Sequence, residues 1–507
     1  MKGPLLAALC VAALLAAGCL STPETPASVG QVNATTAITV KDAAALVHVA
    51  GDNLSGKVAS AVSAATFFLN HDAAEPTIGI TKDGSLFYAA ATFQNDIAGQ
   101  PFPGGLPRTD ILRSDDGGKT WKDVTPYLPG GVVRAHPETG DPYVYVDMET
   151  GRVFDIDQRL ALTCHTVTWS DDKGASWSPV DGKACLTPPA DHQTIVAAKP
   201  RMLVPSPLYP KIVYYCNNQI ATSTCTRSLD GGATFEPTAP AFLGAEPSGD
   251  AQNPNVCGGL HGHLKAAPDG TVYLPKTQCD KPSVAVTQDD GLSWTQHAVA
   301  NMKSNDDPAV AVDQKNNVYM VFMNAEDFHL YLVSSKDAGA HWSAPLDVTA
   351  PGVTTTNLPA LIAGDEGRVA LAYVGTTTPD ATKVKNDDEA TLNNMTWDAY
   401  LAVITNATSE KPSVTTLRVN PADDPLVRGH CGPGRCPGLY DFIDVQMDAD
   451  GRPWVALVDA CVKKCAETTG TAKDSTGRAA FVATFAEGPS LFAKFEALPA
   501  IHGAGGK

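Results

Sequence analysis

Residues 114–121 read Ser-Asp-Asp-Gly-Gly-Lys-Thr-Trp, and their pattern, Ser/Thr-x-Asp-x-Gly-x-x-aromatic, returns four more times along the chain. The further copies begin at Ser170, Ser228, Thr287 and Ser335. In each copy the Asp and the Ser or Thr can accept backbone N–H bonds in a tight turn, and the Gly can supply a positive φ angle. Because the copies start 48–59 residues apart, they predict stacked or radially arranged units.

A second repeat, offset from the first, supplies strands around these turns. Its clearest copies begin at Glu75, His261 and Asp307, and each continues into a short apolar strand, a turn and a second strand. Weaker copies begin at Asp141, His192, Leu358 and Phe442. Four short strands per unit, punctuated by Gly, Asp and aromatic residues, are typical of a β-propeller. The sequence therefore predicts an all-β fold, a β-propeller of four-stranded antiparallel blades, with seven blades favoured and six as the alternative.

The repeated turn resembles the Asp-box, or BNR repeat, of the sialidase-like β-propeller superfamily. The resemblance extends over most of residues 75–500 and implies the scaffold, since the motif serves the turn and not the chemistry. Sialidases of this superfamily use an arginine triad to bind the sugar carboxylate, a Tyr nucleophile activated by Glu, and an Asp acid/base, and the resemblance would imply the same residues here. The first triad Arg lies in an Arg-Ile-Pro motif, and here that place holds Glu75. A carboxylate would repel the group that Arg binds, so exo-sialidase activity is not expected.

The N-terminus has the features of a targeting segment. Residues 1–18 predict a signal peptide, because Lys2 precedes an apolar run too short to cross a bilayer. Residues 15–19, Leu-Ala-Ala-Gly-Cys, resemble the lipobox of prokaryotic lipoproteins, which implies a lipid on Cys19 and a membrane-anchored protein at the cell surface. Ordinary secretion is the alternative.

The remaining segments are short. Residues 19–36, rich in Thr, Pro, Ser and Ala, predict a flexible tether. Residues 37–70 are a lead-in segment, with a short helix near residues 42–49 or a strand that closes the ring. Residues 71–500 are the propeller, and residues 501–507 a disordered tail.

Cysteines and charge limit the partners. Ten cysteines follow Cys19, and in an exported chain an even number predicts disulfides. Their spacing suggests five local pairs, with zinc ligation as the alternative for the last two: Cys164–Cys185, Cys216–Cys225, Cys257–Cys279, Cys431–Cys436 and Cys461–Cys465. The net charge of −18 disfavours nucleic acid and makes a lipid anchor the expected contact with membranes. It favours metal ions, cationic ligands or neutral sugars.

Polar residues begin most of the predicted inner strands. The positions expected at one level around the central channel are Glu75, Asp141, His192, His261, Asp307, Leu358 and Phe442. Side chains of a strand alternate between its faces, and the residues expected to join this level from neighbouring positions are Asp191, Asp306, Asp441, His263 and Asp444. The proposed disulfides and the longest insertions fall on loops of the same face, which is therefore the expected working surface.

This ring predicts a binding site for a cation or a polar ligand. His261 and His263 are a candidate chelating pair for a divalent metal ion, the one cofactor that the sequence suggests, with His192 and Asp307 as co-ligands. A water-filled channel without a ligand is the alternative. The favoured function is a non-catalytic, surface-anchored propeller that binds a glycan, a protein or a metal-dependent ligand. A glycoside hydrolase is the alternative, with weak catalytic candidates Glu75, Asp307, Asp441 and Tyr440.

Overall fold

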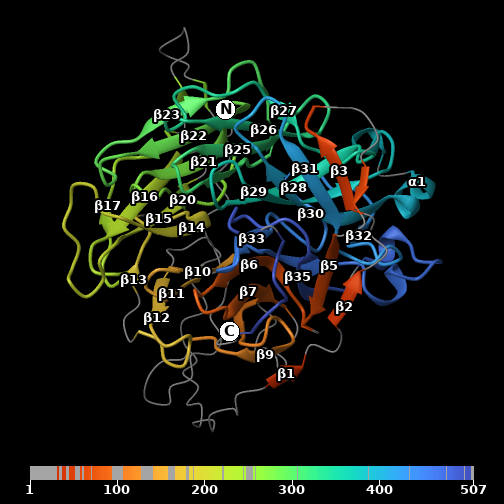
Figure 1. The fold of residues 1–507 in the computed structure, drawn as a ribbon, viewed down its shortest axis with the longest axis horizontal. Helices are drawn as coiled ribbons and strands as arrows, with labels where there is room; N and C mark the ends of the chain where they lie inside the picture. The colour runs from red at the N-terminus through yellow and green to blue at the C-terminus, as the bar shows by residue number, and fades with distance from the viewer. Residues whose placement is uncertain are drawn as a thin grey trace, which may run out of the picture.

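Seven small antiparallel sheets are arranged around a common centre (Figure 1). This computed structural model describes residues 71–93, 107–126, 141–157, 166–178, 188–219, 222–243 and 259–503, apart from 305, 386–387, 433, 476 and 496. It also describes short segments at 31–33, 37–40, 45–51, 57–59, 62–69, 182–186, 245–246 and 255–256. The predicted β-propeller is confirmed, and it has seven blades.

Each blade runs outward from its innermost strand. Blades 1 and 2 consist of β6 (Ala74–Ile80), β7 (Leu86–Thr92), β8 (Arg108–Ser114) and β9 (Thr120–Asp123), then β10 (Pro142–Val146), β11 (Val153–Asp157), β12 (Thr166–Ser170) and β13 (Gly182–Lys183). Blades 3 and 4 consist of β14 (Asp191–Ala198), β15 (Ile212–Gln219), β16 (Thr222–Ser228) and β17 (Glu236–Pro237), then β20 (Lys265–Ala266), β21 (Val272–Gln278), β22 (Lys281–Thr287) and β23 (Thr295–Ala298).

The same order continues through the last three blades. Blades 5 and 6 consist of β24 (Ala309–Val312), β25 (Val318–Met323), β26 (Leu330–Ser335) and β27 (Leu346–Asp347), then β28 (Thr355–Ala363), β29 (Val369–Thr376), β30 (Thr396–Thr405) and β31 (Ser413–Arg418). Blade 7 consists of β33 (Asp444–Met447), β34 (Pro453–Asp459), β35 (Ala479–Glu487) and β5 (Ser63–Phe68).

The ring is closed by a strand from the N-terminal region. β5 pairs antiparallel with β35, so that one blade combines strands from both ends of the propeller. Phe67 of β5 is buried and stacks on Trp454 of β34, with ring centroids 6.0 Å apart. Closing a circular sheet assembly in this way removes the unpaired edge that an open ring would leave.

Further strands and short helices extend the blades. They are β1 (Gln31–Asn33) on β9, β2 (Ala37–Val40) on β5, β3 (Ala45–Val49) on β31, β4 (Lys57–Ala59) on β3, β32 (Val427–Arg428) on β30, the hairpin β18 (Ala245–Glu246) and β19 (Asn255–Val256), α1 (Glu389–Asn394) and the 3-10 turns η2 (Ala381–Lys383), η3 (Lys463–Cys465) and η4 (Ala472–Asp474).

The helix predicted near residues 42–49 is wrong. Residues 45–49 form β3, because the free edge of β31 offers a row of backbone partners and pairing there outweighs local helix propensity. β1 lies within the segment predicted as a tether, and β2 to β5 within the predicted lead-in. Ile501, the first residue of the predicted tail, packs against the largest core cluster.

The Asp-boxes form the turns between the third and fourth strands of blades 1 to 5. In the first box, Ser114 Oγ accepts the N–H of Gly118 at 2.9 Å, and Asp116 Oδ1 accepts the N–H of Thr120 at 2.8 Å. Gly118 has a φ of 87°, a conformation that Gly adopts without the steric cost of a side chain. Trp121 is buried and donates its indole N–H to the Gly118 carbonyl at 2.9 Å. The motif is therefore a turn device here, as the resemblance implied.

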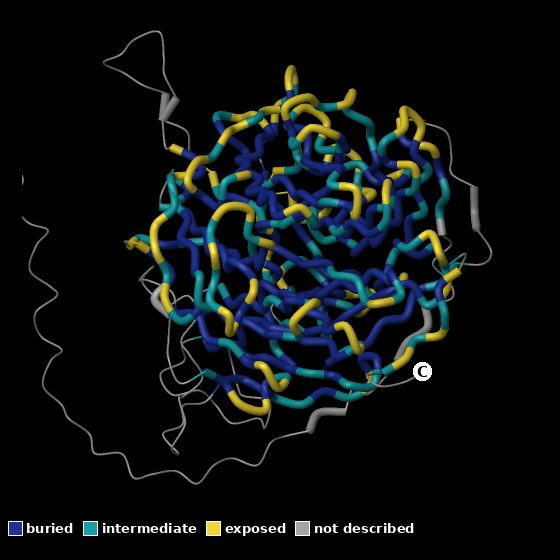
Figure 2. Tube along the Cα trace, turned by 60° about the vertical axis from the view of Figure 1, so that its left-hand side comes forward, coloured by how far each residue is buried: buried dark blue, intermediate teal, exposed yellow. Residues whose placement is uncertain are grey.

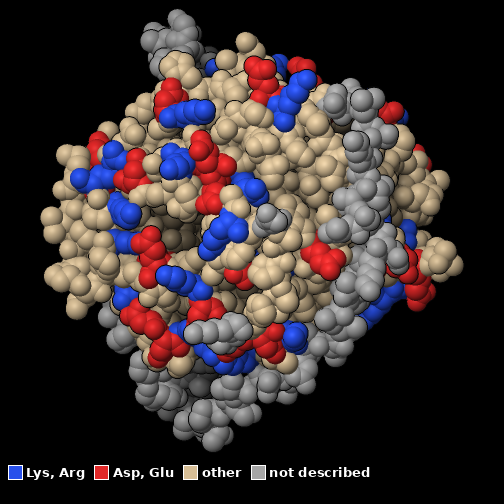
Figure 3. All heavy atoms as spheres, viewed as in Figure 1, with Lys and Arg blue, Asp and Glu red and all other residues tan. Residues whose placement is uncertain are grey.

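Buried residues fill the blades, and exposed residues concentrate in loops (Figure 2). On the face viewed in Figure 3, acidic and basic side chains intermix, and the surface is hollowed near its middle.

Three of the predicted disulfides are present: Cys216–Cys225, Cys431–Cys436 and Cys461–Cys465. Cys185 and Cys279 are also disulfide-bonded, while Cys164 and Cys257 lie outside the described residues. Disulfides persist mainly in oxidising compartments, which indicates an exported protein. The signal peptide (residues 1–18) and Cys19 lie outside the described residues. Within the part of the chain that is described, no helix has the length and hydropathy needed to cross a membrane.

Candidate ligand site at the channel mouth

The inner strands share one register around the channel. Neighbouring blades are joined by hydrogen bonds at equivalent positions. In each bond, the side chain two residues after the ring position of one blade accepts the backbone N–H three residues after the ring position of the next blade. These bonds are Ile78 N–H to Asp444 Oδ2 (3.2 Å), Val144 N–H to Thr77 Oγ1 (2.9 Å) and Leu264 N–H to Thr194 Oγ1 (2.9 Å). A second pocket, of about 1240 Å³, lies at the other end of the channel. Each of the seven inner strands lines it with the residue five positions after its ring position: Ile80, Val146, Ala197, Ala266, Val312, Ala363 and Met447. The structure therefore places the seven predicted ring positions at one level.

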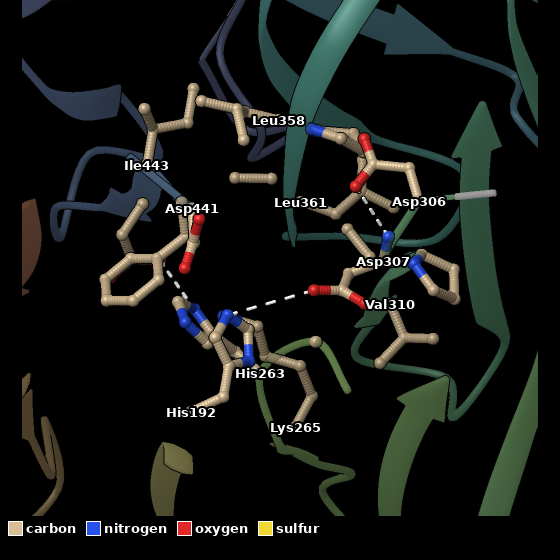
Figure 4. Close-up of a pocket in the computed structure, with 17 residues that line it drawn as sticks. His192, His263, Lys265, Asp306, Asp307, Val310, Leu358, Leu361, Asp441 and Ile443 are labelled. Carbon is tan, nitrogen blue, oxygen red and sulfur yellow. Dashed lines mark hydrogen bonds and ion pairs between the residues drawn. The ribbon is translucent and has the colours of Figure 1, made fainter. Parts of the chain in front are cut away.

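A pocket of about 460 Å³ lies at this level, at the end of the channel where the inner strands begin. Part of this volume is open to solvent, so the pocket is a shallow one. His192, His263, Asp307 and Asp441 face one another on one side of the pocket (Figure 4). Leu358 and Ile443 line the other side (Figure 4), while Phe442 packs edge-on against the rings of His192 and His263, with centroids 5.4 and 5.1 Å away.

Three ring positions have an unusual backbone. Glu75, His192 and Leu358 have φ angles of 51°, 53° and 53°, and each lies where the pairing of its inner strand shifts register. Positive φ is costly for residues with large side chains, and a bulge re-aims the side chains around it. The same positive φ occurs at the same position in blades 1, 3 and 6. The rest of the fold therefore maintains these side-chain positions although the backbone conformation is unfavourable.

Glu75 and Asp141 form a buried carboxyl pair on the side of blades 1 and 2. Burial raises the pKa of Glu75 well above its ordinary value, and Asp141, which is hydrogen-bonded to it, raises the pKa further. Burial also raises the pKa of Asp141. Two carboxyl groups in contact cannot both ionise cheaply, so the pair favours sharing one proton.

This pair predicts a pH dependence of stability that Glu75→Gln should reduce. The pKa of Glu75 is higher in the folded chain than the value of about 4.3 in an unfolded chain. Its contribution to stability is therefore complete below about pH 4.3 and is lost as pH rises through the folded-state pKa. We expect the wild-type unfolding free energy to fall more steeply with pH than that of Glu75→Gln, measured by denaturant unfolding between pH 4 and 9. Parallel pH profiles would contradict the shared proton.

The three ring histidines leave nitrogen atoms unpartnered inside the protein. His261 Nδ1 lies 3.0 Å from the Gly262 carbonyl and His192 Nδ1 lies 2.5 Å from the His261 carbonyl. A carbonyl only accepts, so both Nδ1 atoms carry the hydrogen. His263 Nδ1 lies 3.9 Å from Asp444 Oδ1. The Nε2 atoms of all three are buried and have no hydrogen-bond partner.

The protonation states of these histidines differ. Burial lowers the pKa of His261 well below its ordinary value, and the charge of His192 lowers it further. Burial also lowers the pKa of His263, against the opposing effect of Asp444. Burial disfavours the charged form of His192 too, but the surrounding carboxylates outweigh it and raise the pKa; these are Asp307, Asp141, Asp441 and Asp191. His261 and His263 are therefore neutral and present Nε2 lone pairs, while His192 favours the imidazolium.

Three aspartates complete the mouth. Asp307 Oδ2 lies 3.8 Å from His192 Nε2 (Figure 4). Burial and the neighbouring Asp307 raise the pKa of Asp306 to about 7, and Asp306 Oδ2 is buried without a hydrogen-bond partner. Asp441 receives two hydrogen bonds from the guanidinium of Arg435. The mouth therefore combines a carboxyl group held by an Arg with one that titrates near neutrality.

Arginines on this face are engaged by protein groups. Arg435 binds Asp441, Arg478 pairs with Asp72 at 3.0 Å, and Arg428 donates to the Cys465 carbonyl at 2.7 Å. Tyr440 accepts a hydrogen bond from Arg478 at 3.1 Å, where a sialidase nucleophile would be activated by a Glu. Arg134 lies outside the described residues.

The metal prediction has no direct support. Among the described residues, no group of three or more His, Cys, Asp or Glu side chains is arranged to hold a metal ion. A divalent metal at His192, His261, His263 and Asp307 stays a prediction.

Two lysines near the site were not anticipated from the sequence. Lys276 of β21 is fully buried, and burial lowers its pKa to about 8 against the attraction of Asp307. It is bridged to His261 through the backbone. Lys265 lines the pockets at both ends of the channel. Their only sequence signal is a cation within an inner or second strand.

Comparisons with known proteins agree with this scaffold. A model of the BNR repeat-like domain matches residues 208–420, and no curated protein matches the sequence. Among solved structures, a protein of unknown function from Dyadobacter fermentans has a TM-score of 0.40 at 13% identity, covering 82% of this chain and 95% of that one.

Two sialidase structures are similar to the same degree. The intramolecular trans-sialidase from Ruminococcus gnavus has a TM-score of 0.37 at 12% identity, over 81% of this chain and 95% of that one. The NanB sialidase from Streptococcus pneumoniae has a TM-score of 0.38 at 10% identity, over 82% and 69%. At these values the likeness carries no argument about this chain. The five Asp-boxes and the seven blades make the chain a β-propeller with Asp-box turns, and residues 208–420 of it match the BNR repeat-like domain.

Proposed function

We propose that this protein binds a neutral or amine-bearing glycan at the channel mouth. The observation that carries the proposal is the excess of hydrogen-bond acceptors there. His263 lines the pocket with a neutral ring whose Nε2 has no hydrogen-bond partner, and Asp307 adds carboxylate oxygens. Buried acceptors without partners are costly, so a ligand that supplies O–H or N–H donors gains binding free energy by satisfying them.

The same acceptors select against acidic sugars. A ligand carboxylate would bring a second negative charge toward Asp307 and Asp441, and the Arg435 guanidinium is already committed to Asp441. Phe442, Leu358 and Ile443 add apolar surface to the pocket, which suits the C–H face of a sugar ring. An amine-bearing sugar adds charge attraction to the carboxylates, at a site where partial burial weakens solvent screening.

The test is a comparison of three oligosaccharides of equal length, one neutral, one amine-bearing and one carboxylate-bearing, by isothermal titration calorimetry. We expect the amine-bearing or the neutral ligand to bind at least tenfold more tightly than the carboxylate-bearing ligand. Preference for the carboxylate-bearing ligand, or binding of a surface protein with no glycan binding, would refute the proposal.

Attachment at the cell surface is part of the same proposal. The lipobox resemblance of residues 15–19 supports a lipid on Cys19. We expect the protein to incorporate labelled palmitate in a bacterial host and Cys19→Ser to abolish incorporation. Release of unlabelled protein into the medium would favour ordinary secretion.

Glycoside hydrolysis is the second candidate, and the neutral-range titration of Asp306 favours it. A carboxyl group with a pKa of about 7 in a pocket can donate a proton to a leaving group, with Asp441 as the carboxylate partner. We expect release of reducing sugar from a polysaccharide panel to decline as pH rises through about 7, because the protonated form of Asp306 is needed. Asp306→Asn should abolish release and leave glycan binding in place. Absence of release across the panel would leave binding as the function.

A further inference from the structure

An exposed apolar loop lies at the end of the molecule opposite the channel mouth. Residues 199–211, named here the apolar prong, join β14 to β15. Met202, Val204 and Leu208 expose 64%, 87% and 89% of their surface, and Leu292 of the fourth Asp-box exposes 51%. Large aliphatic side chains this exposed in one loop mark an interaction surface.

The prong is held firmly in place by hydrogen bonds. The buried carboxylate of Asp290 accepts the backbone N–H groups of Arg201 (3.0 Å), Met202 (2.6 Å) and Leu203 (2.7 Å). Further along, the N–H of Ser206 donates to the Leu229 carbonyl at 2.6 Å, and the buried Tyr209 donates to Asp147 at 2.9 Å. Prolines at 200, 205, 207 and 210 restrict the backbone between these points. The exposed side chains are therefore presented by a preorganised support, which lowers the entropic cost of docking.

We propose that the apolar prong inserts into the surface of a lipid bilayer and so turns the channel mouth away from the membrane. Protruding side chains at 87% and 89% exposure suit shallow insertion into the interfacial region, whereas a protein partner normally needs a broad, complementary patch. This proposal goes beyond glycan binding, and it rests in part on the proposed lipid at Cys19.

The length of the N-terminal segment is compatible with this arrangement. β1 begins at Gln31, twelve residues after Cys19. A chain of that length spans at most about 40 Å, so an anchored propeller would remain close to the bilayer.

The orientation follows from the inner strand of blade 3. His192 stands at the beginning of β14 and the prong follows its end at Ala198. A strand of this length separates them by about 20 Å along the channel. With the prong in the bilayer, the candidate ligand site opens toward the medium, where glycans are reached.

Apolar contact, not charge, supplies the affinity. The prong itself contains Lys199, Arg201 and Lys211 and no acidic residue, although the whole chain carries −18. Arg201 is paired with Asp269 at 2.9 Å and Lys211 with Asp147 at 2.6 Å. Binding should therefore depend little on ionic strength.

The experiment places an environment-sensitive fluorophore on the full, lipidated chain. NBD is attached at Leu208→Cys and, as a matched control on the opposite face, at the exposed Lys383→Cys. On phosphatidylcholine vesicles we expect a blue shift and a several-fold rise in emission at 208, with quenching by nitroxide lipids, and no change at 383. An unchanged signal at 208 while the chain is vesicle-bound overturns the proposal, as does a change at 208 that requires an added protein and no lipid.

A second measurement separates the prong from the anchor. In a Cys19→Ser background, Met202→Ser, Val204→Ser and Leu208→Ser together should reduce flotation with phosphatidylcholine vesicles by at least tenfold, since each side chain loses the gain from apolar burial. The melting temperature and glycan binding should stay unchanged, because the three residues are exposed and far from the mouth. Equal flotation with and without the triple substitution contradicts insertion. Failure of glycan binding alone would count against the proposed function and leave the prong unaffected.

Discussion

Asp307→Asn is expected to weaken binding of a neutral or amine-bearing oligosaccharide by about ten- to a hundredfold, since a hydrogen bond to a charged group contributes ~1.5–3 kcal/mol. Asp307 lies at the mouth beside His192, and its backbone N–H is fixed by Asp306 at 2.7 Å. The substitution removes negative charge while keeping the shape. Titration calorimetry at neutral pH measures the change.

Asp423→Asn is the matched control, because Asp423 is exposed outside the pocket. Burial and the nearby Asp441 raise the pKa of Asp307, against the effect of His192. Wild-type affinity should therefore fall on acidification at a pH above the ordinary range of Asp, and the Asn variant should lack this step. Equal affinities of wild type and Asp307→Asn would show that the carboxylate does not contact the ligand.

Phe67→Ala is expected to lower the free energy of unfolding by about 3–5 kcal/mol, the usual cost of removing a fully buried Phe. Phe67 of the closing strand β5 is 3% exposed. Its ring stacks on Trp454 of β34 and packs next to Gly118 in the first Asp-box turn. Its loss leaves a cavity where the N-terminal strand meets the end of the propeller. Denaturant unfolding followed by fluorescence and circular dichroism measures the effect.

The adjacent Phe68 provides the comparison. It lies on the opposite face of β5, is only partly buried, and stacks on Phe481 with centroids 5.2 Å apart. Phe68→Ala should therefore cost clearly less than Phe67→Ala. If both substitutions cost the same small amount, β5 does not close the ring.

The scaffold could be predicted because its signals are local and repeated. Each Asp-box fixes one turn through bonds between neighbours in sequence, as between Ser114 and Gly118. The polar residues that begin most of the inner strands, Glu75, His192 and His261 among them, then indicated the register of the ring. Because the strand repeat recurs, its weaker copies could be aligned with the clear ones.

What could not be predicted depends on contacts between distant segments. β3 forms a strand because it pairs with the outer edge of β31. No local pattern in residues 45–49 indicates that this edge is available. The pairing of Arg435 with Asp441 and the burial of Lys276 next to His261 arise when loops and second strands fold over the ring. The apolar prong could not be predicted, because the exposure of Val204 and Leu208 is a property of the folded surface.

The most direct test is a crystal structure of the protein with an amine-bearing oligosaccharide. We predict the sugar in the pocket beside Phe442, with its hydroxyl or ammonium donors within hydrogen-bond distance of His263 Nε2 and of Asp307. A ligand bound elsewhere on the propeller, or a carboxylate-bearing sugar held in the mouth by converging arginines, would contradict the account.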